Sequence, residues 1–136
     1  MVRAIRLGEG AWRGAGGHAI LCGMNTILVV EDEALVRLMI VETLRDDGFT
    51  VLEAGDAAEA QEILGRAQVD LLVTDLNMPG IDGRALIAHA RERQPNLPAL
   101  LMTGAASGEG AEEGIEVIGK PFSPEDLPEK LRRMLG

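Results

Sequence analysis

The sequence predicts an α/β fold in which helices cover both faces of a parallel β-sheet. Two observations lead to this prediction. Segments of strand type and of helix type alternate five times along residues 25–135, and this alternation is typical of parallel sheets with right-handed crossover connections. The strand segments are apolar throughout rather than alternating between polar and apolar residues, as expected when helices bury both faces of a sheet.

The first strand and the first helix have clear signals. Residues 25–33, NTILVVEDE, form a short β-branched and apolar run closed by acids, which predicts a buried strand. Residues 34–46, ALVRLMIVETLRD, predict a helix because large apolar residues recur at helical spacing, at Leu35, Leu38 and Met39. Gly48 lies just past this helix and is a stop signal.

The next helix lies between two further strand segments. Residues 49–54, FTVLEA, predict the second strand. Residues 56–67, DAAEAQEILGRA, predict an Ala-rich helix, because Asp56 and Glu59 form a capping-box pattern at its start. Residues 69–75, VDLLVTD, predict the third strand.

The following helix has its own cap signal. Asp82 can cap residues 83–93, GRALIAHARER, a predicted helix that ends before Pro95. Residues 98–104, PALLMTG, predict the fourth strand. Residues 105–114, AASGEGAEEG, contain three glycines and little apolar periodicity, so we expect a shortened or frayed fourth helix.

The last two elements complete the alternation. Residues 115–120, IEVIGK, predict the fifth strand. Residues 123–135, SPEDLPEKLRRML, predict the last helix, with Ser123 as its cap and Pro124 at its first position, where proline is tolerated.

Composition and charge argue against several classes of protein. The net charge of −9 argues against direct binding to nucleic acid or to anionic membranes. Cys22 is the only cysteine, so no internal disulfide can form, and a reducing cytoplasm is the expected location. No run approaches the roughly 18 apolar residues that a membrane-spanning helix needs.

The first 23 residues differ from the rest of the chain. They hold six of the 17 glycines and show neither the helical nor the strand period. We therefore interpret residues 1–23 as a flexible N-terminal tail and residues 24–136 as a single domain. Since Met24 directly precedes the first strand, our hypothesis is that the natural chain starts there.

Polar residues follow four of the five predicted strands. Glu31 and Asp32 follow the first strand, Asp75 ends the third, Thr103 lies at the end of the fourth, and Lys120 at the end of the fifth. Ligands of open α/β sheets bind beyond the carboxyl ends of the strands. We therefore expect these side chains to gather at one edge of the sheet.

The three acids predict a metal site. Two carboxylates about 4 Å apart repel each other by about 1 kcal/mol in water and by several times that at a protein surface. A cation relieves this repulsion, and a set of ligands made only of oxygen atoms suits Mg2+. Glu31, Asp32 and Asp75 therefore predict an Mg2+ site, toward which Asn77 can turn its backbone carbonyl from the turn that follows.

Asp75 also has the chemistry of a nucleophile. A carboxylate can attack phosphorus and form an aspartyl phosphate. The equatorial oxygens of the transition state then need cations and hydrogen-bond donors. Mg2+, the ammonium of Lys120 and the hydroxyl of Thr103 can supply them, so the set predicts phosphoryl transfer onto Asp75.

Four segments, ILVVEDE, LLVTDLNMPGIDG, LLMTG and IGKPF, resemble the signature segments of the receiver domain of two-component response regulators. They occur in the family's order, and the resemblance covers residues 24–136. It implies a flavodoxin-like, doubly wound (βα)5 fold with strand order 2-1-3-4-5. It also implies Mg2+-dependent transfer of a phosphoryl group to Asp75 from the phosphohistidine of a sensor histidine kinase or of a histidine phosphotransfer protein.

The resemblance also assigns roles to the other residues. Glu31 and Asp32 match the family's acidic pair, and Asn77 the residue that gives a backbone carbonyl to the metal. Thr103 matches the switch hydroxyl and Lys120 the phosphate-binding lysine. The chain ends one helix after Lys120, so we expect a stand-alone receiver that signals to a downstream protein and catalyses only its own phosphorylation and dephosphorylation.

Two departures from the family pattern fall on the side of the domain that many receivers use for output. The family often has an aromatic residue three positions before the lysine, where this chain has Val117. The segment 104–114 is also short and Gly-rich. We therefore expect this loop, rather than an aromatic side chain, to respond to phosphorylation.

Two other functions compete with this reading. An aspartate-nucleophile phosphatase of the haloacid dehalogenase type needs a second acid two residues after its nucleophile, where this chain has Asn77. A pseudo-receiver that acts only as a scaffold does not need the intact acidic set. Small-molecule tests separate the three functions. A receiver should take up a single phosphate, a phosphatase should turn over a phosphomonoester repeatedly, and a scaffold should do neither.

Overall fold

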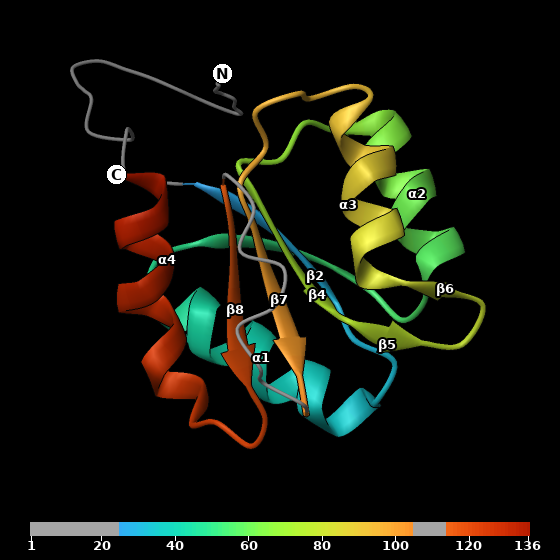
Figure 1. The fold of residues 1–136 in the computed structure, drawn as a ribbon. Coiled ribbons are helices and arrows are strands. Elements are labelled where there is room, and N and C mark those ends of the chain that lie inside the picture. The colour runs from blue at the N-terminus through green and yellow to red at the C-terminus, as the bar shows by residue number, and fades with distance from the viewer. Residues whose placement is uncertain (1–24, 105–113) are drawn as a thin grey trace, which may run out of the picture.

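The computed structural model describes residues 25–104 and 114–136. Five parallel strands form one sheet in the order β3-β2-β4-β7-β8 (Figure 1). Counted along the chain, this is the order 2-1-3-4-5, so the predicted doubly wound, flavodoxin-like fold is confirmed. The strand bounds are β2 Thr26–Val30, β3 Thr50–Ala54, β4 Leu71–Asp75, β7 Ala99–Thr103 and β8 Ile115–Gly119.

The helices cover the sheet in two layers (Figure 1). Helices α1 and α4 lie against one face, and helices α2 and α3 lie against the other. A short 3-10 helix, η2, directly precedes α4. The bounds are α1 Ala34–Asp46, α2 Ala57–Arg66, α3 Gly83–Arg91, η2 Pro124–Asp126 and α4 Leu127–Leu135.

The sheet separates two hydrophobic cores. Alternate residues of each strand point to opposite faces, so neighbouring residues of one strand enter different cores. In β4, for example, Leu72 packs toward α2 and α3, whereas Leu71 and Val73 pack toward α1 and α4. All five residues of β4 are buried, as expected for a central parallel strand and as the continuous apolar run predicted.

Helix α1 has the predicted bounds but buries a different face from the one that its spacing suggested. Its buried residues are Ile40, Val41 and Leu44, which pack into the core shared with α4. The residues that gave the helical spacing in the sequence, Leu35, Leu38 and Met39, are exposed. The helix is apolar on two sides, and only packing against the sheet selects the side that is buried.

Two of the three predicted helix caps are confirmed. The Asp56 side chain accepts a hydrogen bond from the Glu59 amide at 2.8 Å, and the Asp82 side chain accepts one from the Ala85 amide at 2.9 Å. The prediction for Ser123 was wrong in its contact, because this residue makes no side-chain capping bond. The chain there enters a 3-10 turn before the α-helix begins, so the first amides of α4 lie beyond the reach of a cap at 123.

A short hairpin that the sequence analysis did not predict follows β4. Strands β5 (Asn77–Met78) and β6 (Ile81–Asp82) pair in antiparallel fashion, and Gly80 in their turn has a φ of 92°, a conformation that favours glycine. Gly83 closes the hairpin: its amide donates to the carbonyl of Leu76 at 2.7 Å. The hairpin therefore returns the chain to the end of β4 before α3 begins.

Several sequence-based predictions lie outside the described residues. They are the flexible tail at residues 1–23, the shortened fourth helix at 105–114, and the response of that loop to phosphorylation. Among residues 25–104 and 114–136, none of the helices is long and apolar enough to cross a membrane.

Candidate functional site

The site lies at the carboxyl edge of the sheet, where the polar residues were expected to meet. Glu31 follows β2, Asp75 is the last residue of β4, and Lys120 follows β8. Strands β2 and β4 are hydrogen-bonded neighbours running in the same direction, so their carboxyl ends bring Glu31 and Asp75 together. Lys120 comes from β8, on the far side of β7.

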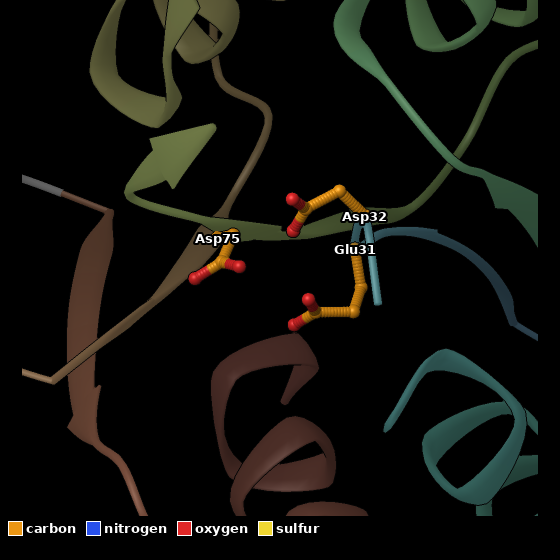
Figure 2. A group of neighbouring side chains, drawn as sticks. All are labelled: Glu31, Asp32 and Asp75. Carbon is orange, nitrogen blue, oxygen red and sulfur yellow. The ribbon is translucent and has the colours of Figure 1, made fainter. Parts of the chain in front are cut away.

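Three carboxylates converge at this edge (Figure 2). One oxygen from each of Glu31, Asp32 and Asp75 lies within 4.8 Å of the other two. Glu31 is fully buried and Asp75 is 7% exposed, whereas Asp32 is exposed at the rim. The cluster therefore opens to solvent on the Asp32 side and rests on the core on the Glu31 side.

The ammonium of Lys120 joins two of these acids. Its Nζ lies 3.0 Å from Glu31 Oε1 and 3.0 Å from Asp75 Oδ1, and it also donates to Asp75 Oδ2 at 3.1 Å. The Lys120 side chain is 26% exposed. The sequence analysis expected Lys120 near Asp75 but did not anticipate its contact with Glu31, which joins residues 89 positions apart.

Burial and neighbouring charges shift the pKa of Glu31 and of Lys120. Desolvation by burial raises the pKa of Glu31, and the nearby charge of Asp75 acts in the same direction. The Glu33 amide, which donates to Glu31 Oε2 at 3.1 Å, and Lys120 act against this rise in pKa but do not cancel it. Burial acts to lower the pKa of Lys120, but its hydrogen bonds and charge interactions with Glu31 and Asp75 outweigh burial and raise it.

Thr103 and Asn77 lie close to Asp75 along the sheet and along the chain. Thr103 ends β7, whose residue Met102 is paired with Asp75 in the ladder. It is 3% exposed, and its backbone carbonyl accepts from the Lys120 amide at 2.7 Å. Asn77 begins β5, two residues after Asp75, and pairs with Asp82 across the hairpin. Its side chain is exposed.

Gly83 lies directly against the backbone of Asp75, and the sequence analysis did not predict this close approach. A Cβ atom at this position would collide with the backbone carbonyl oxygen of Asp75 and would lie 2.9 Å from Leu101 Cδ2. The first residue of α3 is therefore in close contact with the last residue of β4. The sequence signal was the Asp-Gly pair at 82–83, which was interpreted only as a helix cap followed by the first helical residue.

With this geometry in view, the chain can be compared with known proteins. The family model of the response regulator receiver domain matches residues 27–132. This match covers most of the chain and includes the sheet, the helices and the acidic edge described above. The chain belongs to the receiver domain family.

Two curated relatives illustrate the match. The receiver is 39% identical to the chemotaxis protein CheY of Pseudomonas aeruginosa over 116 residues, covering 79% of this chain and 94% of CheY. It is 34% identical to the aerobic respiration control protein ArcA of Escherichia coli (strain K12) over 114 residues, covering 80% of this chain and 48% of ArcA. The chain thus spans about half the length of ArcA.

A solved structure adds a comparison of the fold. The receiver superposes with a TM-score of 0.72 on the response regulator TrrA from Thermotoga maritima, a structure in complex with Mg2+ and BeF. The identity is 27%, and the match covers 82% of this chain and 99% of that chain.

Receiver domains are phosphorelay signalling domains rather than ordinary enzymes, so neither the phosphatase nor the scaffold alternative is favoured.

Proposed function

We propose that this receiver accepts a phosphoryl group on the carboxylate of Asp75. The observation that carries the proposal is the contact between Lys120 Nζ and both oxygens of Asp75, at 3.0 and 3.1 Å, beside two further acids. An ammonium at this distance can move from the carboxylate oxygen to an oxygen of an incoming phosphoryl group. Asp32 is the exposed member of the cluster, so a donor would approach from its side.

The transfer step is a displacement at phosphorus. An oxygen of Asp75 forms a bond to phosphorus while the bond from phosphorus to the histidine nitrogen of the donor breaks, and the electron pair remains on that nitrogen, which takes up a proton. Lys120 holds the developing negative charge on the phosphoryl oxygens. We assign the hydroxyl of Thr103, from the neighbouring strand, the role of a hydrogen-bond donor to the same group.

The acidic cluster has the chemistry of an Mg2+ site. Its donor atoms are carboxylate oxygens, which Mg2+ prefers. Three carboxylates and one ammonium leave a formal charge of −2 when all are ionised, which a divalent cation would neutralise. We assign Glu31, Asp32, Asp75 and the backbone carbonyl of Asn77 to hold it. When bound, Mg2+ would neutralise charge on the phosphoryl oxygens.

Membership of the family supports a proposal for the donor and for the target. Receiver domains interact with histidine kinases and with downstream proteins. For this chain we propose a sensor histidine kinase or a histidine phosphotransfer protein as the donor, and a downstream protein that reads the phosphorylated form. The reaction of this domain is then limited to its own phosphorylation and to the later hydrolysis of its aspartyl phosphate.

The proposal is tested with a small phosphodonor. With acetyl phosphate and Mg2+, the wild-type chain should gain the mass of one phosphoryl group and lose it again on incubation. Asp75→Asn should gain none. Asp82→Asn is the matched control, because asparagine caps a helix as well as aspartate does and Asp82 lies only seven residues away. Phosphorylation of Asp75→Asn, or repeated turnover of a phosphomonoester by the wild type, would contradict the proposal.

A further inference from the structure

Arg37 connects the end of two strands to helix α1 beside the acidic cluster. It is the fourth residue of α1, at the end of the first turn, and its side chain is 22% exposed. Nη1 donates to the backbone carbonyl of Glu31 at 2.7 Å, and Nε donates to Glu53 Oε1 at 3.2 Å. One side chain therefore holds the residue after β2, a residue of β3 and the helix that follows.

The Glu31 carbonyl lies where the β2–β3 ladder ends. The ladder pairs Thr26 with Thr50 through Val30 with Ala54, and the Glu31 amide adds one more bond to the Ala54 carbonyl at 3.2 Å. Beyond this point the chain turns from strand to helix, and the Glu31 carbonyl accepts from Arg37. The guanidinium thus fixes the plane of the peptide that joins Glu31 to Asp32.

Arginine suits this position better than another cation would. Its planar group carries donors in a fixed geometry, so it can bind a carbonyl and a carboxylate at once and resists rotation between them. Gly55 gives it room: a Cβ atom there would lie 3.2 Å from Nη1 and 3.7 Å from Cζ of Arg37. The guanidinium therefore lies directly over the backbone at the end of β3.

We propose that Arg37 is a positioning residue for the metal-binding acids. By fixing the peptide between Glu31 and Asp32, it sets the direction in which the Asp32 side chain leaves the backbone, and with it the spacing of two of the three carboxylates. The inference rests on the proposed function, in which these acids bind Mg2+. Arg37 acts through Glu31 and Asp32 and is not assigned any contact with the ion or with the phosphoryl group.

The chain contains a matched control for a purely structural role. Arg45 lies on the same helix and donates from Nη2 to the backbone carbonyl of Val51 in β3, at 2.9 Å. Both arginines therefore attach α1 to the backbone of the sheet, but only Arg37 does so at the acidic edge. Loss of either contact should weaken the attachment of α1, whereas only loss of Arg37 should change the acids.

The experiment compares Arg37→Ala with Arg45→Ala in the full chain. Isothermal titration calorimetry would measure the Kd for Mg2+, and amide chemical shifts would report on the Asp32 N–H, whose peptide carbonyl is the one that Arg37 binds. We expect Arg37→Ala to raise the Kd about tenfold, the size usual for residues that orient metal ligands, and to move the Asp32 amide signal in the absence of metal. Arg45→Ala should leave both quantities unchanged.

A conservative variant keeps the inference testable if Arg37→Ala does not fold. Arg37→Lys retains the charge but offers one compact donor group in place of the fork, so its Kd should lie between those of the wild type and of Arg37→Ala. Equal Kd values for wild type, Arg37→Lys and Arg37→Ala would overturn the inference alone. A wild-type chain that takes up no Mg2+ would overturn the metal site of the proposed function and the inference with it.

Discussion

The ammonium of Lys120 contacts the fully buried carboxylate of Glu31 at 3.0 Å, across 89 positions of the sequence. Besides the role proposed for it toward an incoming phosphoryl group, this lysine supplies the counter-charge of a buried acid. A buried carboxylate without such a partner would carry a large cost of desolvation. The pair joins the residue after β2 to the residue after β8, which are the first and last strands among the described residues.

The raised pKa of Glu31 has a consequence for stability. Between the ordinary value of 4.5 and the raised pKa, the folded chain binds more protons at Glu31 than the unfolded chain does. The contribution of Glu31 to the free energy of unfolding must therefore fall as the pH rises from 4.5 to the raised pKa. Glu31→Gln removes the effect, so the variant should gain stability relative to wild type as the pH rises from below 4.5 to neutral.

Urea unfolding in metal-free buffer at several pH values would measure this difference. Glu42→Gln is the control for the loss of one negative charge, because Glu42 is an exposed acid on α1, and the rise expected for Glu31→Gln is measured against the curve of this variant. A Glu31→Gln curve that falls relative to wild type with rising pH would contradict the assignment.

Mg2+ should stabilise the folded chain. At about 100 times its Kd, a ligand that binds only the folded state adds about 2.7 kcal/mol to the free energy of unfolding. Asp75→Asn removes one of the three clustered carboxylates and should lose most of this gain. Asp70→Asn should keep it, because Asp70 accepts from the Thr26 amide at the opposite edge of the sheet. Thermal unfolding with Mg2+, and again after EDTA, would measure both variants.

Gly83→Ala should destabilise the chain by about 1–3 kcal/mol, the usual cost of forcing an extra group into a packed site. The added methyl group would press on the backbone of Asp75 and on Leu101 Cδ2. Gly104→Ala is the control: apart from its chain neighbours, no atom of the described residues lies within 4 Å of a Cβ built there, so its effect should be small. Chemical denaturation of both variants would test this, and equal stabilities would be evidence against the close approach at residue 83.

Gln94→Ala should cost about 1–3 kcal/mol, because it removes the partners of two partly buried backbone groups of Val69. The Gln94 side-chain amide donates to the Val69 carbonyl at 2.7 Å and accepts from the Val69 amide at 3.2 Å. Asn96→Ala removes an exposed amide two residues later and should change stability little. Hydrogen exchange at the Val69 amide gives a second readout, which should speed up only in Gln94→Ala.

Much of this fold was predictable because its signals are local. Continuous apolar runs indicated the buried strands, and the capping pattern at Asp56 depends on residues within one turn of the helix. The bounds of α1 were correct, yet Leu35 and Leu38 turned out to be exposed. A helix with apolar residues on two sides has no local signal for which side is buried, since the sheet that makes the choice is assembled from distant segments.

For the candidate site too, some features could be predicted from the sequence and others could not. The rule that ligands bind at the carboxyl ends of parallel strands was enough to predict that Glu31, Asp75 and Lys120 lie at one edge of the sheet. It could not reveal that Lys120 binds Glu31 as well as Asp75, or that Arg37 holds the Glu31 carbonyl. Those contacts depend on side-chain directions, which are fixed by packing between elements.

The order of the charged residues along the chain bears on its synthesis. Asp75 is translated 45 residues before Lys120, and at about 5–20 residues per second that interval lasts about 2–9 s. During it the nascent polypeptide carries all three carboxylates but not the ammonium that balances them. A cation from the surrounding solution, such as free Mg2+, would replace that missing counter-charge at this stage and so favour early convergence of the three acids.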